Sequence, residues 1–118
     1  MPTKRILSFK YALEGVACAF KEEPNLKIHF LIAAVVVTLG IIFHLSTLDW
    51  LILIITIGVV ISVELTNTAI ESVVDSFTAE AHPGAKKAKD ISAGAVLVVS
   101  IMALVIGILI FLPYLKFY

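Results

Sequence analysis

Residues 50–75 read WLILIITIGVVISVELTNTAIESVVD, an apolar run that passes directly into a polar one. The apolar part, residues 50–63, carries no charge, and Glu64, Glu71 and Asp75 follow it. At about 1.5 Å per residue, the stretch is long enough to cross a hydrocarbon core of about 30 Å as one α-helix. We therefore predict a membrane-spanning helix that continues past its hydrophobic part.

Two further apolar stretches have the length of membrane spans. Residues 26–45 hold three ionisable side chains among apolar ones, and residues 91–112 hold no charge. Polar segments at residues 46–49 and 78–89 separate these stretches from the first one. The pattern predicts spanning helices at about 26–45, 49–75 and 88–114.

The segment before the first span is amphipathic. Between residues 6 and 20, apolar side chains recur at three- and four-residue steps, while Lys10, Glu14 and Lys21 fall elsewhere. This pattern is typical of a helix that lies in the membrane interface. We predict a surface helix over residues 4–22.

The composition supports this assignment and excludes several functional classes. With 60% hydrophobic and 15% charged residues among 118, the chain predicts a single all-α integral membrane domain, residues 1–118. Its nine basic and nine acidic residues balance, which argues against a nucleic-acid partner. The single cysteine, Cys18, excludes an intramolecular disulfide and a cysteine-based zinc site. Because so small a bundle has little interior for a site, we expect a homo-oligomer.

The basic residues predict the orientation of the chain in the membrane. Five precede the first span and three lie in the loop at residues 78–89, whereas the segment around Asp49 has none. By the positive-inside rule, we expect the N-terminus and the polar loop to be cytoplasmic. The acidic end of the second span then lies on the side that holds ATP. The eight residues are Lys4, Arg5, Lys10, Lys21, Lys27, Lys86, Lys87 and Lys89.

The polar part of residues 50–75 has the spacing of one helix face. Glu64, Asn67, Glu71 and Asp75 follow one another at steps of three, four and four residues, so they form a single stripe. Carboxylates in or near a membrane are energetically costly and often mark a functional site. The plainer alternative is a polar end of a helix without a further role.

The two glutamates of the stripe suit different tasks. Glu64 and Glu71 are about 10 Å apart along the axis. Glu64 adjoins the apolar run and suits a proton acceptor, and Glu71, nearer the cytoplasm, suits a cation. Magnesium commonly takes one or two carboxylates, and Glu22 or Glu23 could supply the second. Lysines of the loop could meet phosphate oxygens or simply anchor the chain; no Walker A motif is present.

Three segments carry a resemblance to a known family. The core E-x-x-N-[ST]-A-I-E at residues 64–71, the tripeptide AKD at residues 88–90 and FKEEPNLKIH at residues 20–29 resemble the prokaryotic diacylglycerol kinase family. The segments SFKYALEG at residues 8–15 and NLKIH at residues 25–29 are more similar to its Gram-positive branch, which resembles undecaprenol kinases.

This resemblance implies a fold and a site. The fold is a homotrimer of three-span subunits with a surface helix, and composite sites lie between subunits at the cytoplasmic interface. Glu64 corresponds to the catalytic base, Asn67 to the polar residue beside it, and Glu23 and Glu71 to the pair that binds Mg²⁺. The residues that correspond to the ATP site are Tyr11, Glu23, Glu71, Glu80, His82, Lys89 and Asp90. No lipid-binding residue is assigned.

The function expected from these observations is Mg²⁺-dependent transfer of the γ-phosphoryl group of ATP to the terminal hydroxyl of undecaprenol. The alternative within the family is a diacylglycerol kinase that makes phosphatidic acid, although His29 stands where that branch usually has a glutamate. An ion-conducting subunit would need polar residues across the whole span, and residues 50–63 offer Thr56 and Ser62. In an assembly subunit, the polar stripe would hold helices together.

Overall fold

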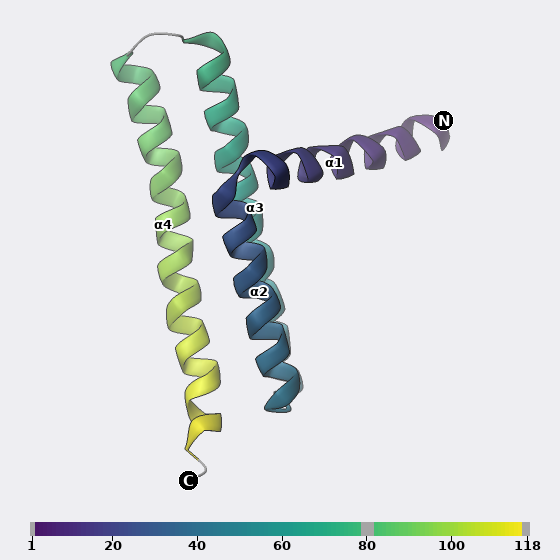
Figure 1. The fold of residues 1–118 in the computed structure, drawn as a ribbon, viewed down its shortest axis with the longest axis vertical. Coiled ribbons are helices and arrows are strands. Elements are labelled where there is room, and N and C mark those ends of the chain that lie inside the picture. The colour runs from purple at the N-terminus through teal and green to yellow at the C-terminus, as the bar shows by residue number, and fades with distance from the viewer. Residues whose placement is uncertain (1, 79–81, 117–118) are drawn as a thin grey trace.

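The computed structural model describes residues 2–78 and 82–116, and the regular elements in these ranges are helical. Three long helices run side by side, and a fourth, nearest the N-terminus, projects sideways from them (Figure 1). We call the end of the bundle nearer to α1 the α1 end and the opposite end the far end. The elements are α1 (Pro2–Glu22), α2 (Pro24–Ile42), α3 (Thr47–Phe77), α4 (Pro83–Phe111) and the 3-10 helix η1 (Leu112–Leu115).

Pro24 separates the projecting helix α1 from the bundle. Glu23 is in an extended conformation, with φ −111° and ψ 107°, and Pro24 occupies the first turn of α2. Proline has no backbone N–H to donate, so it is tolerated at a helix start but not inside one. The chain therefore changes direction at Glu23, and α1 leaves the bundle.

The turn between α2 and α3 ends the first span three residues before the predicted boundary at 45. His44 takes the left-handed conformation, with φ 54°, and the Leu45 backbone N–H donates to the Gly40 carbonyl at 3.1 Å. This is the pattern of a helix C-terminal cap. The Ser46 hydroxyl then accepts from the Asp49 backbone N–H at 3.2 Å and caps the start of α3.

Polar contacts hold the antiparallel pair α3 and α4 in register at both ends. At the α1 end, Lys89 Nζ lies 2.9 Å from Asp75 Oδ1. At the far end, the Tyr114 hydroxyl donates to Asp49 Oδ2 at 2.8 Å. Helix α4 begins at Pro83, before the predicted residue 88, because the His82 ring accepts hydrogen bonds from the next backbone N–H groups and caps the helix.

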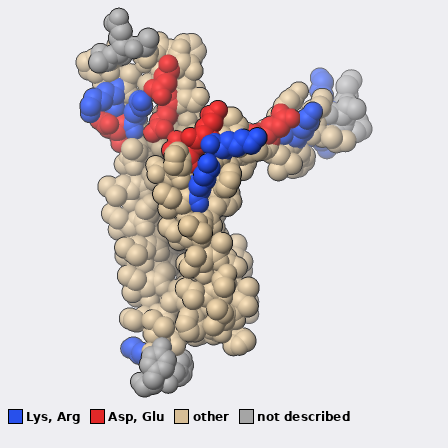
Figure 2. Space-filling model, in the orientation of Figure 1, with Lys and Arg blue, Asp and Glu red and all other residues tan. Residues whose placement is uncertain are grey.

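The outer surface of the bundle is largely apolar and most of its charges gather at the α1 end (Figure 2). Figure 2 shows Lys, Arg, Asp and Glu side chains over α1 and the adjacent ends of the bundle, above a long uncharged shaft. Helices α2 and α3 and the segment Pro83–Leu115 are each long and apolar enough to cross a membrane. The predicted all-α architecture, a surface helix with three spanning helices, is confirmed, and the chain is a multi-pass membrane protein.

The buried core lies at the far end. Leu45, Leu53 and Ile110 form its centre, and Trp50 packs against them. Gly40 makes this packing possible, because a Cβ at that position would lie 2.8 Å from Trp50 Cη2 and 2.9 Å from Leu45 Cδ1. Two helices thus approach closely where one of them lacks a side chain.

We predict that Gly40→Ala lowers the free energy of unfolding by about 1–3 kcal/mol, because the added methyl group overpacks the contact with Trp50. The matched control is Gly58→Ala in α3, where a Cβ meets nothing within 4 Å. That variant should be neutral or slightly stabilising, since alanine favours helix more than glycine does. Unfolding in detergent micelles, followed by the fluorescence of the single tryptophan, measures both; equal effects would contradict the prediction.

Candidate active site

Glu64 is the most deeply buried ionisable side chain of the described residues. It lies on α3 with 1% of its surface exposed, and neither carboxylate oxygen has a hydrogen-bond partner among the residues that the structure describes. His29 of α2 faces it, with Nε2 at 3.6 Å from Glu64 Oε2. A buried carboxylate without hydrogen bonds is costly, so a group poised in this way is available for chemistry.

Asn67 lies one turn farther along the same helix face. It is 7% exposed, and its Nδ2 donates to Glu71 Oε1 at 3.4 Å, while its Oδ1 has no partner among the described residues. The structure therefore places Glu64, Asn67 and Glu71 in one polar row that leads from the apolar interior toward the α1 end. Asp75, the next member of the predicted stripe, is exposed and pairs with Lys89.

The junction of α1 and α2 brings a further carboxylate to this row. The charges of Glu23 and Glu71 both act on the Glu64 carboxylate. Glu23 is half-buried, whereas its neighbour Glu22 is exposed. Of the two residues that the sequence offered as the second carboxylate, the geometry favours Glu23.

The carboxylates fit a magnesium ion that also binds a nucleotide. Among the described residues, no three His, Cys, Asp or Glu side chains converge as a complete metal site. Two protein carboxylates, completed by phosphate oxygens and water, are the usual arrangement for Mg²⁺ in phosphoryl-transfer sites. Glu23 and Glu71 can serve as this pair, because both are half-buried carboxylates whose charges reach Glu64.

The start of α4 carries most of the other residues predicted for ATP. Lys89 pairs with Asp75 and also interacts with the charge of Glu71, so it lies next to the polar row. Asp90 Oδ2 is 2.6 Å from Lys86 Nζ. His82 Nδ1 accepts from the backbone N–H groups of Gly84 and Ala85 at 3.0 and 3.3 Å, which gives it a role as a helix cap.

Two of the predicted ATP residues lie apart from this cluster. Tyr11 is exposed on α1, about 18 Å along the helix axis from Glu23. Glu80 lies outside the described residues. Within one chain, the structure thus gathers Glu23, Glu64, Asn67 and Glu71, with Lys89 beside them.

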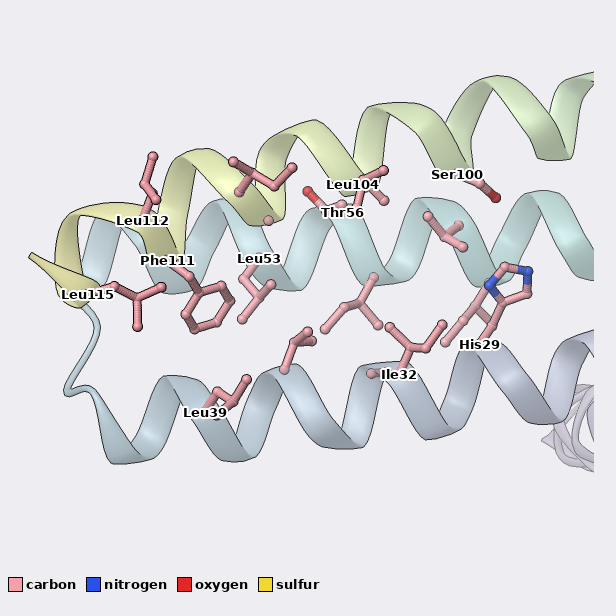
Figure 3. Close-up of a pocket in the computed structure, with 18 residues that line it drawn as sticks. His29, Ile32, Leu39, Leu53, Thr56, Ser100, Leu104, Phe111, Leu112 and Leu115 are labelled. Atoms are coloured by element: carbon pink, nitrogen blue, oxygen red, sulfur yellow. The ribbon is translucent and has the colours of Figure 1, made fainter.

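The sequence analysis did not identify a long apolar groove that begins next to Glu64. It has a volume of about 550 Å³ and lies between α2, α3 and α4. His29 and Ser100 lie at its α1 end, and Leu112 and Leu115 lie at its far end (Figure 3). An ionisable residue within a span is itself a signal of function. From the sequence, His29 was noted as a difference from the diacylglycerol branch and was not assigned to the site.

Comparisons with known proteins agree with this site. Residues 10–111 match the family model described as prokaryotic diacylglycerol kinase. The chain belongs to this family. The predicted resemblance is therefore confirmed, and the match includes α2, α3 and α4 in full with the greater part of α1.

Relatives within the family carry two different names. The undecaprenol kinase of Bacillus subtilis (strain 168) is 44% identical over 106 residues, which cover 90% of this chain and 86% of that protein. The diacylglycerol kinase of Synechocystis sp. is 40% identical over 109 residues, 92% of this chain and 62% of that protein. The diacylglycerol kinase of Escherichia coli (strain K12) is 28% identical over 103 residues, 87% of this chain and 84% of that protein.

We predict that Glu64→Gln stabilises the fold although it removes the group best placed for catalysis. The neutral amide avoids burying a charge that has no hydrogen bond from the described residues, which costs about 1–3 kcal/mol. Thermal unfolding in detergent should give a higher midpoint. Glu14→Gln, at an exposed carboxylate of α1, is the control and should change little. A lower midpoint for Glu64→Gln would refute this interpretation of the site.

Proposed function

We propose that this protein is an ATP-dependent lipid kinase that phosphorylates the terminal hydroxyl of undecaprenol. The observation that carries the proposal is the buried Glu64 carboxylate, which lies 3.6 Å from His29, a residue that lines one end of an apolar groove between three spanning helices. A lipid alcohol can reach a base in this position from within the bilayer, whereas a water-soluble acceptor cannot. Membership of a family whose named relatives are lipid kinases supports the same reaction.

The reaction begins when Glu64 accepts the proton of the lipid hydroxyl. The alcohol oxygen forms a bond to the γ-phosphorus of ATP as the bond from that phosphorus to the leaving oxygen of ADP breaks. The products are a lipid phosphate and ADP, with the proton on Glu64. Asn67 orients Glu71 through its Nδ2 and keeps its own Oδ1 free toward the site.

The neighbouring charges hold the nucleotide. Glu23 and Glu71 would hold Mg²⁺, which would supply positive charge to offset that of the phosphates. Lys89 offsets the charge of the γ-phosphoryl group during transfer, and Asp75 fixes the position of Lys89. Residues that complete the nucleotide site are Tyr11, Glu80, His82 and Asp90.

The active assembly in this proposal is a homotrimer in the bacterial cytoplasmic membrane, with the N-terminus and the loop at residues 78–89 in the cytoplasm. The distance of Tyr11 from Glu23 along α1 supports composite sites, because this residue could reach the nucleotide on a neighbouring copy. The numerous exposed apolar side chains of the spans leave ample surface for lipid and for other copies.

Phosphorylation of diacylglycerol to phosphatidic acid is the second candidate. It is favoured by the names of the Synechocystis and Escherichia coli relatives. Undecaprenol is preferred because the Bacillus relative named for it is 44% identical and because the groove is almost wholly apolar along its length.

We predict that the purified protein in lipid nanodiscs transfers phosphate from ATP to undecaprenol and that Glu64→Gln lowers kcat by about 10²–10⁴-fold, the usual contribution of a general base. Radiolabelled ATP and separation of the lipid products measure the transfer, with diacylglycerol as a parallel acceptor. A preference for diacylglycerol would establish the second candidate. Absence of transfer to either lipid would eliminate the kinase proposal.

We predict a sharp difference between two adjacent glutamates. Glu23→Gln should raise the Mg²⁺ concentration for half-maximal activity by roughly tenfold or more, since it removes a group from the metal's environment. Glu22→Gln is the matched control and should leave this concentration unchanged, because Glu22 is exposed at the end of α1. Titration of activity with Mg²⁺ at fixed ATP decides the matter; equal responses would exclude Glu23 as a metal ligand.

A further inference from the structure

Each of the three spanning helices contributes one polar side chain at the same level of the bundle. The contacts of Asp75 with Lys89 and of Asp49 with Tyr114 fix the register of α3 and α4, and by this register Ser100 lies level with Glu64. His29 of α2 lies 3.6 Å from the Glu64 carboxylate. Figure 3 shows His29 and Ser100 on opposite sides of the α1 end of the groove.

The rest of the groove offers little to a polar group. Its lining is almost wholly aliphatic and aromatic, and the hydroxyl of Thr56 already donates to the Ile52 carbonyl at 2.7 Å. A hydroxyl group inside the groove can therefore meet the polar side chains of His29 and Ser100, of which His29 contacts Glu64. A polar group placed deeper would remain without a partner, which is costly in an apolar environment.

We propose that His29 and Ser100 position the terminal hydroxyl of the acceptor beside Glu64 and restrict the acceptor to isoprenoid alcohols whose only polar group is that hydroxyl. This inference rests on the proposed function and identifies the residues that select its substrate. His29 acts from both sides, since its Nε2 faces the Glu64 carboxylate and its ring borders the groove. Ser100 of α4 borders the same groove.

The same arrangement disfavours diacylglycerol. That lipid carries two ester groups close to its free hydroxyl, and in the groove their oxygens would leave water without matching donors. A site that leaves polar groups of the wrong substrate unpaired discriminates strongly against it. We expect a preference of about tenfold or more for the isoprenoid alcohol from this effect.

The occupant of the groove is the isoprenoid chain of the acceptor. The groove is continuous with the contact between His29 and Glu64 at one end and extends to Leu115 at the other, so a chain whose hydroxyl lies at the base has an apolar path through the bundle. Gly107 lines this path, and a Cβ there would meet nothing within 4 Å. The space beside Gly107 is therefore available to the chain.

The test compares acceptor kinetics of full-length variants in lipid nanodiscs, with undecaprenol and diacylglycerol as acceptors. His29→Leu and Ser100→Ala should each raise KM for undecaprenol by about tenfold and reduce the preference over diacylglycerol, while KM for ATP stays unchanged. The conservative changes His29→Gln and Ser100→Thr should recover part of the loss. Thr38→Val is the control, because the Thr38 hydroxyl bonds to the Ala34 carbonyl outside the groove.

The outcomes separate this inference from the proposed function. If the unmodified protein phosphorylates undecaprenol and the variants at His29 and Ser100 keep its KM and preference, the inference is overturned and the kinase proposal stands. If the unmodified protein phosphorylates neither lipid, both are overturned. An unchanged KM for ATP shows that a variant is folded. If a variant instead binds both ATP and the lipid acceptor more weakly, its role is merely structural, and this result also counts against the inference.

A second variant tests the occupant of the groove. Gly107→Leu should raise KM for undecaprenol without changing KM for ATP or the oligomeric state in micelles, because it fills space used by the chain. Gly58→Leu, which has open space around it but lies outside the groove, should have no such effect. Dissociation of the oligomer by Gly107→Leu alone would assign the groove to a helix of another copy and overturn the proposed occupant.

Discussion

The burial of the Glu64 carboxylate is the constraint on which the rest of the site depends. This carboxylate is 1% exposed and has no hydrogen bond from the described residues. Burial of such a group in a membrane protein is energetically costly and usually marks a functional site. Helix α3 places this group at the boundary between an apolar shaft and a polar end. The facing His29, the row through Asn67 and Glu71, and the groove between the spans are all arranged around that one position.

The turn at Pro24 and the ion pair between α3 and α4 determine which charged side chains lie near this carboxylate. Pro24 turns the chain, so Glu23 lies at a corner from which its charge acts on Glu64, while Glu22 remains exposed on α1. At the other side of the site, the ion pair of Asp75 and Lys89 ties the start of α4 to the end of α3. A cationic side chain is thereby held beside carboxylates that would otherwise repel one another, which is the arrangement that phosphoryl transfer requires.

The far end of the bundle contributes packing, and the candidate site lies toward the α1 end. Packing is closest at the far end, where Gly40 admits Trp50 and the Tyr114 hydroxyl contacts Asp49. Toward the α1 end, oxygen atoms of Glu64 and Asn67 are buried without a hydrogen-bond partner among the described residues. Close packing at the far end offsets the free-energy cost of the buried Glu64 carboxylate near the α1 end.

The sequence alone determined the helices and the stripe. Long uncharged runs at residues 50–63 and 91–112 specify spans, and steps of three and four residues place Glu64, Asn67 and Glu71 on one face whatever the helix packs against. The spacing of residues alone left Glu22 and Glu23 as alternatives, with Glu23 indicated by the family resemblance, and it did not relate His29 or Ser100 to Glu64. Those relations join different helices, so they depend on the turn at Pro24 and on the register of α3 with α4. The tertiary structure decided them, because periodicity describes one helix at a time.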